Sequence, residues 1–483
     1  MALSPPRLVS LSHESYHHDS PARCIITPEK ERHMTQPHEL TITEAAKNIR
    51  DGALSCVELI ESLLARVSLL EPDLNVWVTM NETDVLATAE RRDAELASEG
   101  PRGPLHGIPV GIKDIYYTQG VTTTACSKIL ADFVPDYDAT TVAKLKQAGA
   151  IIMGKTVTTE FACGDPSPTR NPWNAEHTPG GSSSGSAVGV ATGMFPAAMG
   201  SQTAGSILRP ASFNGIVGLK PTFSRVSRYG VVPVSWSLDT MGPFTRTVED
   251  AALMLSVLAG HDPNDFSSST RPVPDYLNAV ASMRHPPRIG RIRKFFDDNA
   301  NDEVRTHTDA IADKLTNAGA LIEDFDLPSD FDTMLSAHRV LMTVEAAAVH
   351  QEWFEARADE YSPNIRGVIE QGMLTPAVAY VQAQRVRRRF RRELEQALRP
   401  YDAMLSPSTV EPAPHDLGTT GNPMFQTPFT FGGFPSITLP SGLNADGLPL
   451  GVQLAAAPFA DETLLAAARW CEQIIDAKLT PPV

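Results

Sequence analysis

The sequence predicts a large α/β domain in which helices flank a central sheet. Residues 140–148 show a helical pattern, and the apolar segment 149–156 that follows them is typical of a buried strand. This order of helix and buried strand indicates a sheet that helices cover on both faces. After residue 37, neither a repeat nor a change in composition marks a linker. We therefore expect a single domain over residues 37–483.

The N-terminal extension, residues 1–36, is predicted to be disordered. Residues 1–33 are rich in Ser, Pro and His, and they show no periodicity. They also lack the continuous hydrophobic stretch of a signal peptide. Met34 lies just before the first regular segment, so we expect that it is the true start of the chain.

Capping motifs and periodicity define the elements that follow. Thr41–Glu44 and Ser55–Glu58 are capping boxes, and each predicts the start of a helix. A helix is expected over 87–96 and a strand over 106–115. Residues 163–180 are predicted to be a proline-rich loop, and further helices are predicted over 248–260, 304–318, 341–358 and 375–398.

Charge and cysteine usage narrow the classes of function. A formal net charge of −16 opposes binding to a phosphate backbone, so we expect no nucleic-acid partner. The five cysteines have no CxxC spacing and the histidines have no ligand spacing, so we predict no metal and no cofactor. No apolar run is long enough to span a bilayer. Free thiols favour a cytoplasmic protein.

A run of six arginines between Arg385 and Arg392 is the exception to the acidic composition. Alone it resembles a nucleic-acid patch. Because Glu393 and Glu395 continue the helical pattern, we favour a solvated helix face.

Two turns rich in glycine and serine carry the strongest chemical signal. They are Gly180–Ser186 and Gln202–Ser206, and an apolar stretch joins them. Glycine-rich turns let backbone N–H groups converge on one point. A serine nucleophile needs such donors for its oxyanion and a nearby base for its proton. A flexible linker would not lie between an ordered loop and an apolar helix in mid-domain.

The nucleophile is predicted to be Ser206. Gly181–Gly185 also matches the G-x-S-x-G elbow of α/β-hydrolases, with Ser183 as nucleophile, but that elbow directly follows a strand and this one follows a polar loop. The second turn has small residues that let a substrate carbonyl approach. We expect Ser182 to relay the proton of Ser206, and we expect the oxyanion hole to consist of the backbone N–H groups of Thr203, Ala204, Gly205 and Ser206.

Lys113 is the candidate base, at the end of the apolar segment Gly107–Ile112. A lysine with its ordinary pKa of about 10.4 is a poor base at neutral pH. Burial in an apolar site lowers that pKa and makes a neutral amine available. The alternative is that Lys113 forms a surface ion pair with its neighbour Asp114, and position alone leaves both open.

Five runs of the sequence carry a family resemblance, and they are Gly180–Ala187, Gly205–Ser212, Gly215–Thr222, Ser237–Pro243 and Gly447–Leu454. With these runs the chain resembles the amidase signature family over residues 37–483. The resemblance implies a single α/β/α domain with a mixed, mostly parallel sheet. It also implies a small-molecule amide substrate and a cytoplasmic homodimer.

The family resemblance also implies a Ser–cis-Ser–Lys triad. Ser206 would attack the amide carbonyl. Ser182, which follows a cis Gly181–Ser182 peptide bond, would bridge Ser206 to Lys113. Water would then hydrolyse the acyl-enzyme.

The chain departs from the common family pattern at three positions. Gln202 stands where Asp is frequent, Ala204 where Gly is frequent, and Arg209 lies three residues after the nucleophile rather than two. These features resemble short bacterial amidases of the malonamidase type, in which such an arginine holds a substrate carboxylate. Arg209 could instead be a structural residue that braces the turn. The substrate-binding candidates are Arg209, Gln202, Cys126 and Ser127, and Cys126 is expected to be a pocket or core residue rather than a nucleophile.

Two functions are compatible with this resemblance. The first is a stand-alone amidase that hydrolyses a small carboxamide, or an ester or urethane by the same triad. The second is the catalytic A component of a glutamine-dependent tRNA amidotransferase, which Ser227–Val232 resembles. A binding protein without activity is a third alternative that the complete set of Lys113, Ser182 and Ser206 disfavours.

Overall fold

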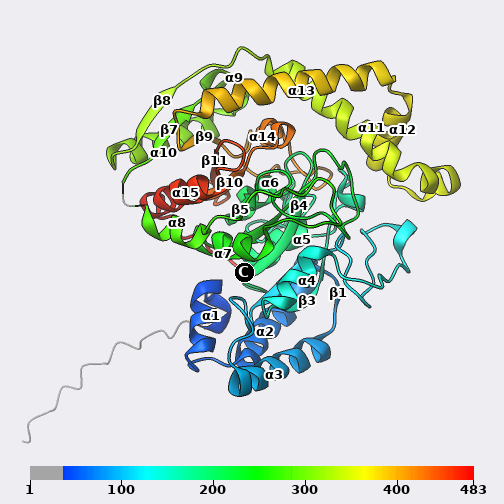
Figure 1. The fold of residues 1–483 in the computed structure, drawn as a ribbon, viewed down its shortest axis with the longest axis vertical. Coiled ribbons are helices and arrows are strands. Elements are labelled where there is room, and N and C mark those ends of the chain that lie inside the picture. Colours follow the sequence, from blue (N-terminus) through cyan, green and yellow to red (C-terminus); the bar gives the residue numbers. More distant parts are fainter. Residues whose placement is uncertain (1–35, 284) are drawn as a thin grey trace, which may run out of the picture. The chain divides into compact units, whose positions relative to one another are not determined.

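An eleven-stranded sheet runs through the part of the chain that the computed structural model describes, residues 36–283 and 285–483 (Figure 1). The order of its strands is β1-β3-β2-β4-β6-β5-β10-β11-β9-β7-β8. The strands are β1 Trp77–Met80, β2 Pro109–Lys113, β3 Ile151–Thr156, β4 Ala197–Gln202, β5 Val217–Lys220, β6 Thr240–Thr245, β7 Arg288–Arg291, β8 Leu321–Asp324, β9 Ala403–Pro407, β10 Ser436–Leu443 and β11 Pro449–Ala455. The predicted disorder of residues 1–36 and the predicted start at Met34 fall almost entirely outside the described residues.

Fifteen α-helices and four short 3-10 helices accompany these strands in the described chain. The α-helices are α1 Ile42–Arg50, α2 Cys56–Leu74, α3 Glu82–Glu99, α4 Thr140–Gln147, α5 Ser184–Ala191, α6 Leu208–Asn214, α7 Val248–Leu258, α8 Tyr276–Ser282, α9 Arg293–Asn299, α10 Asp302–Asn317, α11 Phe331–Arg357, α12 Pro363–Leu374, α13 Ala377–Leu398, α14 Thr427–Gly432 and α15 Asp461–Ile475. The 3-10 helices are Pro37–Glu39, Lys128–Leu130, Glu160–Ala162 and Ala358–Glu360.

The sheet is mixed, as predicted, but it is not mostly parallel. Of the ten strand pairs in the described chain, six are antiparallel and four are parallel. The expectation of a mostly parallel sheet is therefore wrong. A parallel pair needs a long crossover, whereas a short connection such as that between β10 and β11 allows only an antiparallel pair.

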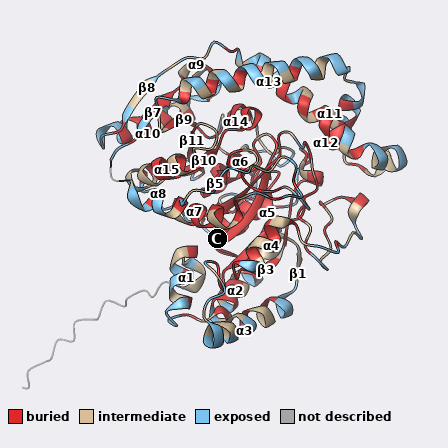
Figure 2. Ribbon diagram, in the orientation of Figure 1, coloured by how far each residue is buried: buried red, intermediate tan, exposed pale blue. Residues whose placement is uncertain are grey.

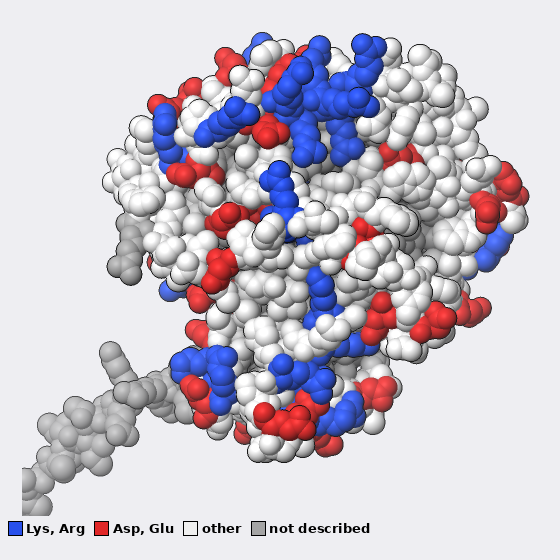
Figure 3. Space-filling model, in the orientation of Figure 1, with Lys and Arg blue, Asp and Glu red and all other residues white. Residues whose placement is uncertain are grey.

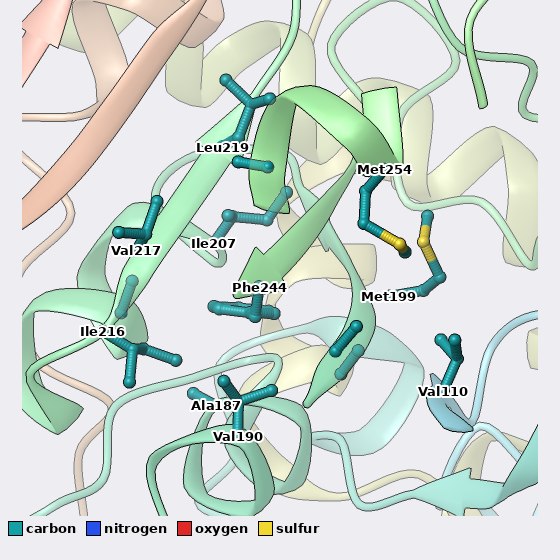
Figure 4. Close-up of a cluster of buried hydrophobic side chains, with 14 of the residues drawn as sticks. Val110, Ala187, Val190, Met199, Ile207, Ile216, Val217, Leu219, Phe244 and Met254 are labelled. Atoms are coloured by element: carbon teal, nitrogen blue, oxygen red, sulfur yellow. The ribbon is translucent and has the colours of Figure 1, made fainter. Parts of the chain in front are cut away.

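The centre of the sheet is buried on both faces (Figure 2). Every residue of β4, β6 and β11 is buried. Because successive side chains of a strand point to opposite faces, this pattern requires cover on both sides. Figure 4 shows the core between β2, β4, β5 and β6, where Val110, Met199 and Phe244 meet side chains of α5 and α7. The predicted α/β class with flanking helices is confirmed.

The predicted capping boxes are confirmed. Thr41 accepts a hydrogen bond from Glu44 N at the start of α1, and Ser55 accepts one from Glu58 N at the start of α2. The helices predicted over 140–148 and 248–260 agree with α4 and α7 within two residues at each end. The helix predicted over 341–358 begins ten residues earlier, at Phe331, because Asp330 caps it with a bond from Thr333 N.

The arginine run lies on α13, where Figure 3 shows a group of Lys and Arg side chains. Arg385, Arg388, Arg389 and Arg392 are exposed, as expected for a solvated helix face. Arg387 and Arg391 are half-buried, and the Arg387 guanidinium donates to the carbonyl oxygens of Phe431 and Ser237 at 2.6 Å each.

Candidate active site

Lys113 is the last residue of β2, and its amine is surrounded by serine hydroxyls. All five residues of β2 are buried, and the side chain of Lys113 has no exposed surface. Lys113 Nζ lies 2.8 Å from Ser182 Oγ, 2.9 Å from Ser183 Oγ and 2.8 Å from Ser201 Oγ. The sheet therefore places this amine beside the first residues of α5 and the end of β4.

Burial changes the chemistry of this amine. It lowers the pKa of Lys113 to about 7, against the opposing effect of the negative charge of Asp239. A neutral amine has two N–H donors and one lone pair. In the neutral state, one of the three neighbouring hydroxyls can thus donate its proton to Nζ.

The alternative of a surface ion pair between Lys113 and Asp114 is wrong. The Asp114 carboxylate lies 3.1 Å from Lys155 Nζ, and both of these side chains are fully buried. Asp114 also accepts hydrogen bonds from the backbone N–H and the hydroxyl of Thr124. The Asp114 carboxylate is therefore bound by Lys155 and Thr124, whereas the amine of Lys113 is bonded to serine hydroxyls.

Ser182 lies just before α5, and its backbone is held on both sides. The Gly181–Ser182 peptide bond is cis, as the family resemblance implies. Thr159 N donates to Ser182 O at 3.2 Å, and Arg209 Nη2 donates to Gly181 O at 2.6 Å. The hydroxyl of Ser182 is therefore presented to Lys113 from a fixed main chain.

Ser206 lies in the turn between β4 and α6, which we call the catalytic turn, residues 203–206. It is buried with 8% of its surface exposed. In the described part of the chain its hydroxyl forms no hydrogen bond, so none joins it to Ser182. The structure thus brings Lys113 and Ser182 into contact and leaves the Ser206 hydroxyl without a partner.

The carbonyl groups of residues 203–205 in the catalytic turn are all engaged. Thr203 O accepts from His338 Nε2 at 2.9 Å, Ala204 O accepts from Thr430 Oγ1 at 2.8 Å, and Gly205 O accepts from Arg209 N at 3.0 Å. In a trans peptide the N–H points opposite to the carbonyl. Within residues 36–283 and 285–483, the N–H groups of residues 203–206, the four predicted oxyanion donors, have no hydrogen-bond partner. Those of residues 204–206 follow carbonyl groups that are held in place, so these three donors are available to an oxyanion in a fixed direction.

Gly205 is required by close packing against the segment before α14. A Cβ at this position would lie 2.5 Å from Gln426 Oε1 and 3.1 Å from Pro423 Cβ. Gln426 is fully buried, and its Nε2 is bonded to Ser408 O. No larger residue fits at 205 unless this segment moves.

The side-chain amide of Gln202 forms hydrogen bonds with other residues of the protein rather than facing a substrate site. Gln202 Oε1 accepts from the N–H groups of Ile207 and Leu208 at 2.9 and 3.0 Å, and Nε2 donates to Thr430 Oγ1 at 3.0 Å. It therefore caps the start of α6, directly after the nucleophile candidate.

Arg209 lies on α6, and its guanidinium faces main-chain oxygens. It donates to Gly181 O at 2.6 Å, Gly421 O at 2.8 Å and Thr420 Oγ1 at 3.0 Å. It is 4% exposed, and burial lowers its pKa to about 9. These contacts connect the residue before Ser182 to the 420–421 loop.

Cys126 and Ser127 lie in the loop after β2. Cys126 Sγ accepts from Thr158 N at 3.4 Å, and burial raises the pKa of this thiol to about 12. Ser127 Oγ donates to Glu160 Oε1 at 2.6 Å. A thiol with so high a pKa is not a nucleophile at neutral pH.

The sequence did not identify Ser201, His338 or Thr430 as members of this site, and it indicated Ser183 only as an elbow nucleophile. Ser201 follows the usual alternation of a strand, so it has no motif of its own. His338 lies in the first turns of α11, which the hydrophobic pattern missed. For Ser183, the elbow motif pointed to a nucleophile, and nothing in the sequence indicated a contact with Lys113.

Two structural observations bear on ligands and membranes. Among the described residues, no three His, Cys, Asp or Glu side chains lie together in a way that could hold a metal ion. Within the same residues, no helix combines the length and the apolar character needed to cross a membrane.

Comparison with known proteins shows the family. Residues 58–465 match the family model described as Amidase. The A component of the glutamyl-tRNA(Gln) amidotransferase of Geobacter metallireducens is 37% identical over 472 residues, which cover 90% of this chain and 97% of the relative. The protein of the same name from Roseiflexus sp. is 38% identical over 468 residues, covering 89% and 96%.

A solved structure is also similar over most of its length. The peptide amidase of Stenotrophomonas maltophilia has a TM-score of 0.81 and 31% identity, and the match covers 92% of this chain and 98% of that one. The fold and these matches define a hydrolase that acts on carbon–nitrogen bonds. The chain belongs to the amidase family.

Proposed function

We propose that this protein hydrolyses a carboxamide through an acyl-enzyme on Ser206, with Lys113 as the base and Ser182 as the proton relay. The observation that carries the proposal is the buried Lys113 amine, 2.8 Å from Ser182 Oγ, with a pKa of about 7. A neutral amine in this position can accept a proton at physiological pH.

The proposed reaction begins when Ser206 Oγ attacks the amide carbon. Its proton passes to Ser182 Oγ as the Ser182 proton passes to Lys113 Nζ. The negative charge on the former carbonyl oxygen is stabilised by the N–H groups of residues 204–206. The C–N bond then breaks, and the leaving nitrogen takes the proton back through the same relay. Water attacks the ester on Ser206 and releases the carboxylate.

The same carbonyl chemistry would cleave an ester or a urethane. An experiment must therefore determine which leaving group the protein accepts. Purified protein is incubated with a mixed panel of amides, esters and carbamates, and the products are identified by mass spectrometry. Ser206→Ala should lose turnover and covalent labelling by a fluorophosphonate probe, with an unchanged melting temperature. Normal labelling of Ser206→Ala would exclude this nucleophile.

A second candidate is that the chain acts as the A component of a glutamyl-tRNA amidotransferase. The curated relatives carry this name at 37 and 38% identity and nearly full length. These relatives support this candidate better than they support a stand-alone amidase. In this form the acyl donor would be glutamine, and the released ammonia would be used with partner subunits.

The two candidates differ in what the isolated chain does. A stand-alone amidase releases ammonia or amine from simple amides without any partner. An amidotransferase component is expected to hydrolyse glutamine, and to do so better when its partner subunits are added. Ammonia release from glutamine and from a panel of simple amides, measured with the same preparation, distinguishes them. The proposed homodimer is measured separately, by light scattering.

A further inference from the structure

The catalytic turn is held by a helix from outside the recognisable family motifs. Thr203, the first residue of this turn, is bound at two points. Its carbonyl oxygen accepts from His338 Nε2 at 2.9 Å, and its hydroxyl donates to Asp239 Oδ1 at 2.5 Å. His338 belongs to α11, whereas Asp239 directly precedes β6.

The chemistry of the two partners determines the direction of the histidine bond. A carbonyl oxygen can only accept, so Nε2 must carry the hydrogen and donate it. His338 is buried, and burial lowers its pKa to about 4, which keeps the ring neutral at physiological pH. The imidazole thus presents one fixed N–H to Thr203 O.

This bond sets the direction of a potential oxyanion donor. Thr203 O and Ala204 N belong to the same planar peptide group, in which the carbonyl and the N–H point in opposite directions. A donor that holds the carbonyl on one side therefore aims the N–H on the other side. The next two peptide groups are held by Thr430 Oγ1 and by the backbone of α6. The Thr203–Ala204 group is the one held by α11.

The same helix also supports the second contact of Thr203. Glu345 lies seven residues after His338, and residues at this spacing share one helix face. Glu345 Oε2 accepts from Ser237 N at 3.0 Å and from the hydroxyl of Ser235. Ser235 N in turn donates to Asp239 Oδ2 at 3.0 Å. One face of α11 therefore reaches Thr203 directly through His338 and indirectly through Asp239.

We propose that His338 is a positioning residue of the oxyanion hole, which holds the Thr203–Ala204 peptide so that Ala204 N–H faces the substrate oxygen. The proposal rests on the proposed function of the Ser206 site. It assigns a role in the reaction to the helical segment 331–357, which carries no family motif. His338 acts through the main chain and does not touch the reacting atoms.

The test compares two replacements of His338 with a matched control. His338→Phe fills the ring volume but cannot donate, and His338→Gln restores an N–H donor at the end of a side chain of similar reach. The control is His350→Phe, which removes another buried histidine of α11. His350 is bonded to the Tyr361 hydroxyl at 3.0 Å and packs against the rings of Phe161 and Trp353, and no hydrogen bond joins it to the catalytic turn within the described residues.

Three quantities are measured for each variant. They are kcat and KM for the amide that the wild type hydrolyses best, the rate of labelling by a fluorophosphonate, and the affinity for phenylboronate. The boronate forms a tetrahedral adduct with a serine hydroxyl. Removal of an oxyanion donor costs about 100-fold to 1000-fold in kcat, so misorientation of one donor should cost roughly 10-fold to 100-fold.

The expected result for His338→Phe is this loss in kcat with little change in KM, and with slower labelling and weaker boronate binding. His338→Gln should recover most of the loss, and His350→Phe should retain the wild-type kcat even where its melting temperature falls. Wild-type kcat in His338→Phe overturns the proposal. So does an equal loss in all three variants, which would indicate a role in folding alone. A wild type that neither hydrolyses an amide nor reacts with the fluorophosphonate would overturn the proposed function as well.

Discussion

The carboxylate of Asp114 lies 3.1 Å from Lys155 Nζ in the fully buried interior. Asp114 is the acidic residue nearest to Lys113 in the sequence, and its carboxylate is paired with Lys155 rather than with Lys113. A carboxylate in contact with Lys113 would favour the ammonium form and raise its pKa. Because Asp114 is engaged elsewhere, the amine of Lys113 meets serine hydroxyls, and its pKa is lowered to about 7.

The first prediction concerns the pH dependence of activity. Proton transfer to Lys113 requires the neutral amine, so kcat/KM should fall as pH drops below an apparent pKa near 7. We would measure kcat/KM for one amide between pH 5 and pH 9. Fluorophosphonate labelling should follow the same acid limb, because it also needs the Ser206 proton removed. A kcat/KM that is constant from pH 5 to pH 8 would contradict the role of Lys113.

The second prediction concerns Ser201, the hydroxyl beside Lys113 that is not in the proposed relay. Hydroxyl oxygens stabilise the ammonium form more than the neutral amine, because a hydrogen bond to a charged group is the stronger one. Ser201→Ala should therefore lower the pKa of Lys113 and move the acid limb to lower pH, by roughly one pH unit. The amidase activity above pH 8 should be retained. An acid limb that moves to higher pH would show that Ser201, rather than Ser182, donates its proton to Lys113.

The third prediction concerns stability. The pKa of Lys113 is about 7 in the folded protein and about 10.4 in an unfolded chain. Between these values the unfolded state binds more protons, so wild-type stability rises with pH in this window. Lys113→Met removes the titrating amine and, with it, this pH-dependent contribution to the free energy of unfolding. Its advantage in melting temperature over the wild type should be largest below pH 7 and should shrink towards pH 10.

Lys220 provides the matched control for this measurement. It is also fully buried, its Nζ donates to Pro221 O at 3.0 Å, and burial lowers its pKa to about 7. Lys220→Met should show the same pH dependence of stability while amidase activity is retained. Calorimetric melting curves of the three proteins from pH 6 to pH 9.5 give the comparison. Parallel curves for Lys113→Met and wild type would mean that Lys113 is not a titrating group in this range.

The fourth prediction decides between the two roles of Arg209. Its guanidinium already binds Gly181 O and Gly421 O, so Arg209→Ala removes the donor of one buried and one half-buried carbonyl group. We expect at least a roughly 10-fold loss in kcat/KM, of similar size for an anionic monoamide and for its neutral analogue. A loss confined to the anionic substrate would instead assign Arg209 to a substrate carboxylate.

Helix starts and individual strands were predictable, because local sequence patterns determine them. Capping boxes located the starts of α1 and α2, and the apolar strand before Lys113 identified β2. The direction of the strand pairs was not predictable in this way, because it depends on which strands become neighbours. The strand pair β5–β10, for example, joins segments more than two hundred residues apart.

In the candidate site, too, the residues in local motifs were predictable and those brought in by long-range contacts were not. Lys113 and Ser182 lie in recognisable motifs, and the structure brings them together at 2.8 Å. His338 reaches Thr203 across 135 positions of the chain, and no local pattern encodes that contact. Ser201 was missed for a different reason, since a serine on a buried strand carries no sign of which amine it faces.

The fit between Gly205 and Gln426 limits how this enzyme can be re-engineered. Directed evolution towards new substrates commonly randomises a few codons around the nucleophile. Here any side chain added at 205 collides with Gln426, whose amide is already anchored to Ser408. A productive library must therefore keep glycine at 205 or diversify 423–426 in the same clones.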